Sequence, residues 1–400
     1  MKLNNRELMD ERFNDSYIAG FVHGDGGFSV QLALSKTTKS KRIRLIPMFT
    51  LTQHIRNLEL IKKIIKRIGN VGSYSVDNKN IMRYRLSKII DFKEKLIPFF
   101  DENQVKKDKL TNYIKLKFIV EKLLTIDNRF RWFSYDLEND NNKLMFDLII
   151  ISINMNNHVK PSINLKQFTL KDQKRILNNE LSLKILEELN NYILNYNYKK
   201  DLNIDFINGL FDSDGWITLR LSSRSKLKNS IFIGCDYGIV SDLLNKELLY
   251  DIKSFFNNVG IIRERTDEKS VSYLVAKTEC ISEILPKIYN VSNYWKILDN
   301  NNNNKTKGPI IKDNKIKVIL KIFGLYEEYK KINKIEKDKR NLILEKILIL
   351  SYEIREINLK NKESLDDYLI RMREKLTKKL KVPARTVPPF GETGTPCGAE

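Results

Sequence analysis

Residues 18–26 read Ile-Ala-Gly-Phe-Val-His-Gly-Asp-Gly, and residues 207–215 read Ile-Asn-Gly-Leu-Phe-Asp-Ser-Asp-Gly. Both stretches are mainly apolar, both close on Asp-Gly, and both lead into alternating sequence that is typical of a β-strand. A stretch that returns in the second half of a chain indicates an internal duplication. We therefore expect two repeats, each opening with a helix that ends in an acid.

Small residues stand four positions apart in both stretches, at Gly20 and Gly24 and again at Gly209 and Ser213. This spacing puts them on one face of a helix and lets two helices approach more closely than the usual ~8–10 Å. The two stretches are thus predicted to pack against each other as helices. Gly26 and Gly215 are expected to take the left-handed turn that launches each strand.

Asp25 and Asp214 stand at the last turn of these helices, where the helix dipole disfavours an unpaired carboxylate by roughly 0.3–1 kcal/mol. A positive charge should offset them, and two converging carboxylates form a hard-oxygen site that suits Mg²⁺. Such an arrangement activates water and stabilises the leaving oxygen in phosphodiester hydrolysis. The alternative is that Asp-Gly only marks a helix-to-strand turn, which is less compatible with two copies in equivalent contexts.

The elements around the stretches follow one order in both halves. After the first stretch, strand-like alternation is found at residues 28–34, 42–53, 73–76 and 82–86, and helical spacing of apolar residues is found at 57–68, 89–100 and 110–124. After the second stretch, strands are predicted at 216–221, 230–236, 261–265 and 271–276, and a helix is predicted at 248–259. We predict an α/β (α+β) protein with a first repeat at 1–124, a helical linker at 125–203, a second repeat at 204–323, a charged helical extension at 324–382 and a disordered tail at 383–400.

The charge of the chain favours a polyanionic partner. Its 400 residues hold 71 Lys+Arg against 50 Asp+Glu, a formal charge of +21, and 42% are hydrophobic, enough for sizeable cores.

The three cysteines, Cys235, Cys280 and Cys397, and the three scattered histidines have no zinc-site spacing, and a sparse odd set of cysteines argues against disulfides. We find no secretory core or membrane-spanning run and expect a soluble protein.

The two stretches resemble the nine-residue signature of the LAGLIDADG homing endonucleases, and two copies resemble the single-chain, two-repeat branch. The resemblance implies a monomer of two pseudo-symmetric αββαββα repeats, with the motif helices at the interface and two antiparallel sheets over the DNA major groove. It implies that Asp25 and Asp214 bind a divalent metal, Mg²⁺. His23 and Asn208 depart from the usual sixth and second motif residues.

Further site residues follow from the resemblance. Gln53, at the end of its strand, matches a glutamine that orders water near the metal, although a solvated strand-end amide is the alternative. Its nearest match in the second half is Cys235 or Asp236. By position, the lysine near the scissile phosphate is predicted at Lys106 or Lys107 in the first repeat, and at Lys315 or Lys317 in the second.

DNA-reading residues are predicted from the alternation of side chains along each strand. Arg can bind guanine and Gln adenine through two hydrogen bonds, while surrounding lysines contact phosphate. The predicted DNA-binding residues are Gln31, Arg44, Thr50, Arg83, Arg85, Arg220, Ser222 and Arg224, with Ala33, Ser35, Met48, Thr52, Ser75 and Asp77 on the same faces.

Three functions are open at this point. The first is a site-specific double-strand DNA endonuclease, encoded within an intron. The second, which the resemblance also allows, is an RNA maturase that assists splicing of its own group I intron; the third is a non-catalytic transcription regulator. The bias toward Asn, Lys and Ile indicates an AT-rich coding genome and an organelle, in the first place the mitochondrion with the chloroplast as the alternative.

Overall fold

The computed structural model describes residues 12–34, 42–127, 131–133, 139–155, 170–199, 201–223, 231–276, 279–298, 308–333, 335–357 and 363–378. By the contacts between its residues, the chain divides into two compact units. One contains residues 1–218 and 235–320, and the other contains residues 219–234 and 321–400. The tail predicted at 383–400 lies outside the described residues.

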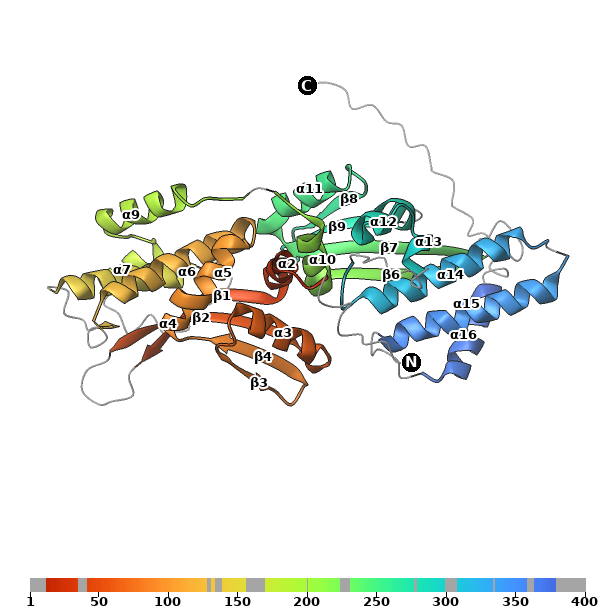
Figure 1. Ribbon diagram of the computed structural model, residues 1–400, viewed down its shortest axis with the longest axis horizontal. Helices are drawn as coiled ribbons and strands as arrows, with labels where there is room; N and C mark the ends of the chain where they lie inside the picture. Colours follow the sequence, from red (N-terminus) through yellow and green to blue (C-terminus); the bar gives the residue numbers. More distant parts are fainter. Residues whose placement is uncertain are drawn as a thin grey trace, which may run out of the picture. The chain divides into compact units, whose positions relative to one another are not determined.

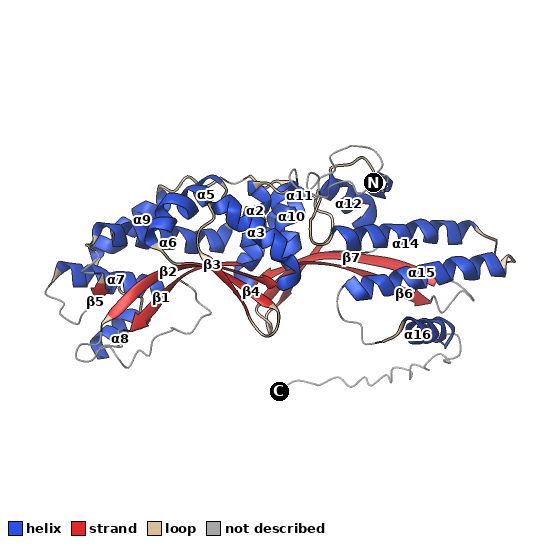
Figure 2. Cartoon of the chain, turned by 60° about the horizontal axis from the view of Figure 1, so that its bottom comes forward, coloured by secondary structure: helices blue, strands red, loops and turns tan. Residues whose placement is uncertain are grey.

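The first repeat follows the predicted order of elements. These are α2 (Asp15–Asp25), β1 (Gly26–Leu34), β2 (Ile43–His54), α3 (Leu58–Ile68), β3 (Ser73–Val76), β4 (Ile81–Leu86), α4 (Ile89–Asp91), η2 (Phe92–Leu96), α5 (Ile97–Glu102) and α6 (Lys107–Thr125). The strands form an antiparallel sheet in the order β1-β2-β4-β3, with the short β5 (Trp132–Phe133) added to β2. Helices α3, α5 and α6 lie on one side of this sheet (Figure 2).

The second repeat has the same order and a matching sheet, β6-β7-β9-β8. Its elements are α10 (Ile204–Asp214), β6 (Gly215–Ser223), β7 (Ile231–Asp242), α11 (Lys246–Phe255), β8 (Ile261–Arg265), β9 (Ser270–Ala276), η6 (Cys280–Ile284), α12 (Leu285–Tyr289), α13 (Trp295–Leu298) and α14 (Asp313–Lys331). Helix α14 occupies the place of α6, and it continues across the predicted domain boundary at residue 323. The predicted mixed fold with two antiparallel sheets is therefore confirmed.

Apolar side chains that alternate along the strands build the core of the first repeat. Phe28 and Phe49 point to the helix side, where their rings meet Phe100 of α5 and Tyr113 of α6 at centroid distances of 5.2–5.9 Å. Tilted and edge-on ring pairs of this kind add to the free energy of apolar burial. This aromatic cluster fixes α6 over the sheet and with it the side chains at the beginning of α6.

Helices α2 and α10 lie side by side and form the contact between the repeats, as Figure 1 shows. A side-chain carbon added at Gly20 would lie closer than 3.0 Å to the backbone of Phe206, and one added at Gly209 would lie equally close to the backbone of Tyr17. Added at Gly24, such a carbon would collide with Ser213. Gly20, Gly24 and Gly209 therefore lie where the two helices pack closely, at the positions predicted from the spacing of small residues.

Gly26 and Gly215 do not take the left-handed conformation expected from the sequence. Their φ angles are −87° and −85°, and their ψ angles are 159° and 163°, which is extended backbone. A side-chain carbon would instead collide with Val22 at Gly26 and with Phe211 at Gly215. Both positions need glycine for space, because the strand begins directly against the last turn of the motif helix.

The predicted linker contains helices α7 (Asp140–Ile153), α8 (Leu170–Leu177) and α9 (Leu183–Leu194). The apolar side chains of α7 are buried in the same core as those of α6 and β1.

The extension contains α15 (Lys337–Ile357) and α16 (Leu365–Lys378), joined by a hydrogen bond of 2.7 Å between Ser351 and Tyr368. Among the described helices, none has the length and apolar character needed to cross a bilayer.

We expect Gly20→Ala to lower the melting temperature of the protein strongly. The new methyl group would meet backbone of α10, which cannot move away without separating the two helices, and overpacking of this kind costs typically 1–3 kcal/mol or more. Gly27→Ala is the matched control, because its methyl group would meet only the Thr50 hydroxyl, a side-chain atom. Equal melting temperatures for the two variants in differential scanning fluorimetry would contradict the role of Gly20.

Candidate active site

Asp25 and Asp214 occupy the C-terminal ends of the two packed helices. Each helix begins at an asparagine cap, Asn14 for α2 and Asn203 for α10, whose side chain accepts a hydrogen bond from the first turn. A side-chain carbon at Gly24 would lie 2.9 Å from Oδ2 of Asp214, so the end of one helix lies against the carboxylate of the other. The close helix packing therefore brings the two predicted acids together.

Both carboxyl groups have raised pKa values. Burial raises the pKa of Asp25 to about 6, with a further rise from the charge of Asp214, against the lowering effects of Gln53, Lys312 and Lys109. Burial also raises the pKa of Asp214, against the lowering effects of the same two lysines. The two neighbouring acids are therefore difficult to ionise at the same time, and a bound cation would stabilise their ionised forms.

Gln53 lies at the end of β2 and donates a hydrogen bond from Nε2 to Oδ2 of Asp25. Its Oε1 accepts from Nδ2 of Asn57 at 2.8 Å and from the backbone nitrogen of His54 at 3.2 Å. Because two donors meet the oxygen, the amide nitrogen faces the carboxylate. The structure thus places Gln53 against Asp25.

Two buried lysines lie at the ends of the motif helices. Lys109 Nζ donates to the backbone oxygens of Gly26 at 2.6 Å, Gly24 at 3.2 Å and Val22 at 3.3 Å. Lys312 Nζ donates to the backbone oxygens of Phe211 and Asp212. Burial lowers the pKa of Lys109 to about 8 and lowers that of Lys312, while Asp25 and Asp214 act in the opposite direction.

These lysines supply the positive charge that the sequence required at the helix ends, since the last carbonyl groups of each helix carry its negative pole. Two carboxylates and two ammonium groups therefore face one another across the helix interface. In the described part of the chain, no group of three or more His, Cys, Asp and Glu side chains is arranged to hold a metal ion. Any cation here would rest on the carboxylate pair.

The sequence of the chain matches the family model of the LAGLIDADG endonucleases twice, at residues 18–120 and 207–294. Each match begins inside a motif helix and continues through the sheet of its repeat. The chain belongs to the LAGLIDADG endonuclease family. The predicted family and its two-repeat arrangement are confirmed.

Curated relatives of this LAGLIDADG protein match shorter stretches. A protein of Mycosarcoma maydis, "Probable intron-encoded DNA endonuclease 1", is 29% identical over 91 residues, which cover 23% of this chain and 31% of the relative. "Probable intron-encoded endonuclease 2" of Neurospora crassa is 26% identical over 104 residues, 26% of this chain and 21% of the relative. The chain thus spans about a third or less of each relative.

Solved structures of LAGLIDADG proteins match most of the fold. The chain is 14% identical to I-SmaMI, solved with an uncleaved DNA target and calcium ions, and the match covers 83% of this chain and 97% of that one with a TM-score of 0.59. For I-LtrWI bound to target DNA, the identity is 17%, the coverage 82% and 95%, and the TM-score 0.60. At these identities the likeness shows the fold alone.

The lysines predicted from the sequence have other partners in the structure. Lys106 Nζ donates to the backbone oxygen of Lys199 at 2.6 Å, and Lys107 pairs with Glu247 and Asp251 at 3.3 Å. In the second repeat, Lys317 pairs with Asp313 at 2.9 Å, and Lys315 lies further along α14. The lysines that lie at the ends of the motif helices are instead Lys109, in the first turn of α6, and Lys312, directly before α14.

The second-repeat counterpart of Gln53 was also misjudged from the sequence. Strand β7 continues past Asp236 to Asp242, and it has the same length as β2, 12 residues. Both strands end in a residue whose side chain caps a short 3-10 helix, His54 in β2 and Asp242 in β7. Ser241 therefore corresponds to Gln53, while Cys235 is buried against Cys280.

The predicted DNA-binding residues of the first repeat share the sheet face that points away from the core. Gln31, Arg44, Arg83 and Arg85 are exposed, and Thr50 pairs with Arg85 across β2 and β4. Arg44 lies over the ring of Trp132 at 5.8 Å, and Arg83 contacts Asp77 at 3.4 Å. In the second repeat, Arg220 is exposed and Ser222 is half-buried, and Arg224 and Ser35 lie outside the described residues.

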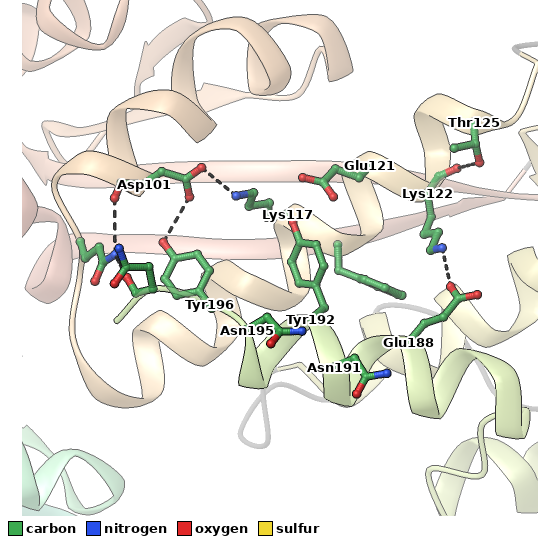
Figure 3. A pocket seen from close by; sticks show the side chains of 13 residues that line it. Asp101, Lys117, Glu121, Lys122, Thr125, Glu188, Asn191, Tyr192, Asn195 and Tyr196 are labelled. Carbon is green, nitrogen blue, oxygen red and sulfur yellow. Dashed lines mark hydrogen bonds and ion pairs between the residues drawn. The ribbon is translucent and has the colours of Figure 1, made fainter. Parts of the chain in front are cut away.

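A cavity of about 960 Å³ lies between α6 and α9, away from the acids. Figure 3 shows pairs among its lining residues: Asp101 with Lys117 and Tyr196, and Lys122 with Glu188. These pairs join the linker to the last helix of the first repeat. The cavity is therefore a feature of linker packing, separate from the candidate active site.

We expect Asp25→Asn to raise the melting temperature of the metal-free protein. The pKa of Asp25 rises from 3.8 to about 6 on folding, so its ionised form opposes folding by roughly 2–3 kcal/mol at neutral pH. The folded state binds the proton more tightly, so stability falls as pH rises from about 4 to 6, and the advantage of the variant exists above this window. Thermal unfolding at pH 7.5 and at pH 4 tests this; an advantage at pH 4 equal to that at pH 7.5 would contradict it.

Proposed function

We propose that this chain is a site-specific double-strand DNA endonuclease that hydrolyses phosphodiester bonds with a divalent metal, Mg²⁺. The observation that carries the proposal is the meeting of Asp25 and Asp214 at two helix ends, with Lys109 and Lys312 beside them. The family supports a nuclease, and solved structures with the same fold were obtained with target DNA.

The donor set fits a hard divalent cation. Mg²⁺ is commonly held by one or two carboxylates together with water and substrate phosphate, so a pair of acids is sufficient. Burial keeps the pKa values of Asp25 and Asp214 raised although Lys109 and Lys312 lower them, so a bound cation would favour the ionised form of both acids. When bound, the metal would supply Lewis-acid stabilisation of the phosphate and of the leaving oxygen.

The residues of the chain itself arrange the other parts of the chemistry. Gln53 holds the Asp25 carboxylate in one orientation, because its own amide is fixed by Asn57. Lys109 and Lys312 present ammonium groups beside the acids, where they can stabilise negative charge that develops on a phosphate oxygen. The helix backbone holds both lysines in place before DNA arrives, which lowers the cost of reorganisation.

Asp25→Asn, Asp214→Asn and Lys312→Met should each reduce DNA cleavage by at least about 100-fold, the scale for loss of a preorganised charge in an active site. Cleavage is measured with Mg²⁺ on duplexes that the wild-type protein selects from a randomised library. Asp140→Asn is the matched control, since Asp140 is exposed and pairs only locally with Lys143. Wild-type rates for both active-site acid variants would refute the proposed function.

We also propose that the outward sheet faces contact the DNA target. Arg83 and Arg85 stand on adjacent outward positions of β4, and Gln31 lies on the same face of β1. An arginine that pairs with guanine contributes about 1–3 kcal/mol of discrimination. The net charge of +21 would add contacts to phosphate that do not depend on sequence.

Arg85→Ala should weaken binding to the selected duplex by roughly tenfold and reduce discrimination at one base pair. Arg67→Ala removes the same charge from the helix side, where Arg67 pairs with Asp15 at 2.6 Å, and should change affinity little. Fluorescence anisotropy at several salt concentrations separates the two effects. Equal losses for both variants would mean that only total charge matters and that β4 does not face DNA.

A second candidate function is an RNA maturase that assists splicing of the intron encoding the chain. The observation that favours it is the additional helical structure outside the two repeats, α7 to α9 in the linker and α15 and α16 in the extension. Relatives named as intron-encoded support an intron origin, and we propose a monomer in an organelle, most simply the mitochondrion. RNA binding that survives loss of both acids would favour this function.

A further inference from the structure

Asp212 is a buried acid that the proposed chemistry does not use. It stands two residues before Asp214 in α10, and its side chain is 3% exposed in a protein that is rich in surface charge. Oδ2 accepts hydrogen bonds from Tyr17 Oη at 2.7 Å and from the backbone nitrogens of Ile310 at 2.5 Å and Ile311 at 2.9 Å. Oδ1 accepts from the backbone nitrogen of Lys312 at 3.0 Å. Four donors therefore converge on one carboxylate.

Three of these donors belong to the segment that enters α14, and this segment carries the active-site lysine. Lys312 is bound by Asp212 at both of its ends: the backbone nitrogen donates to the carboxylate, and Nζ donates to the backbone oxygen of Asp212 at 2.6 Å. The segment is anchored again at Asp313, whose Oδ1 accepts from Tyr289 Oη at 2.7 Å. The carboxylate of Asp212 thus holds the backbone of Lys312, while the backbone oxygens of Phe211 and Asp212 hold its ammonium group.

The first repeat holds its lysine differently. The residue that corresponds to Asp212 is His23, and its Nδ1 accepts one hydrogen bond of 3.4 Å from the backbone nitrogen of Lys106. The segment before α6 is held instead by the linker. Gln104 donates to the backbone oxygen of Asn197 at 2.6 Å and accepts from the backbone nitrogen of Lys199 at 2.9 Å. The two halves of the active site are therefore supported by different contacts.

We propose that Asp212 is a positioning residue that holds Lys312 in the second half of the active site. This inference rests on the proposed nuclease function and deepens it. A carboxylate offers an acceptor oxygen on both sides, whereas an amide with its oxygen in the place of Oδ2 would turn its own N–H groups toward the backbone nitrogen of Lys312 and leave that nitrogen buried without an acceptor. Loss of the carboxylate would therefore release the segment at 310–312 and shift Lys312, while Lys109 would keep its position.

The test compares Asp212→Asn with Tyr17→Phe. The first variant replaces one acceptor oxygen of the segment by an N–H donor, whereas the second removes only the hydrogen bond from α2 and leaves the three backbone contacts. Cleavage is followed on the selected duplex with a different fluorescent label on each strand. Hydrogen exchange measured by mass spectrometry reports on the amides of residues 310–312 in the absence of DNA and metal.

For Asp212→Asn, we expect one strand to be cut about 10–100-fold more slowly, the usual effect of losing a residue that orients an active-site group. The other strand should be cut at the wild-type rate, DNA affinity should not change, and the amides should exchange faster. Tyr17→Phe should resemble wild type. Equal slowing of both strands in both variants, or an Asp212→Asn protein that behaves as wild type, would overturn the assignment.

Two further outcomes are distinct. If wild-type protein cuts neither strand, the proposed function fails, and the exchange rates still decide whether Asp212 holds the segment. If Asp212→Asn does not fold, the wild-type protein alone gives the answer: the amides of residues 310–312 must exchange more slowly than that of Lys106, which has one long hydrogen bond to His23. Exchange as fast as at Lys106 would overturn the proposal.

Discussion

The close approach of α2 and α10 is the constraint on which the rest of the structure depends. Gly20 and Gly209 leave room for the backbone of the opposite helix, so at these two positions the helix backbones approach each other directly. Their C-terminal ends then converge, and so do the negative poles of both helices and the carboxylates of Asp25 and Asp214. This concentration of negative charge is tolerable only beside cations, and Lys109 and Lys312 supply them by binding the terminal carbonyl groups.

Much of this arrangement could be predicted from the sequence because it depends on local signals. The alternation in β1 and β2 and the glycine that ends α3, with φ at 118°, are properties of short segments and appear where expected. The identity of the site lysines could not be predicted in the same way. Lys106, Lys107 and Lys109 lie within four residues of one another in the sequence. The packing of α6 on the sheet decides which of them reaches the C-terminal end of α2.

The glycines after the acids show a different limit of sequence reasoning. A glycine after a helix usually indicates a left-handed residue, yet Gly26 and Gly215 are extended, and their lack of a side chain serves the tight packing of strand against helix. Strand β7 extends to Asp242, beyond the end predicted at residue 236, for a related reason. Gly234 and Gly238 interrupt its apolar pattern, but Gly238 provides the space that the ring of Trp216 occupies on the neighbouring strand. In both cases a tertiary contact, absent from the local pattern, explains the residue.

Joining the two repeats in one chain allows their active-site halves to differ. In a symmetric dimer every substitution appears twice and must suit both copies of the interface. Here the position of Gln53 is taken by Ser241 in the second repeat and that of His23 by Asp212, and linker residues Asn197 and Lys199 bind Gln104 of the first repeat. The pKa of Asp25 therefore responds to an amide that its partner acid lacks in this position. In the proposed function, two different sheets would read an asymmetric DNA target, and each half of the site could then be adjusted to its own strand.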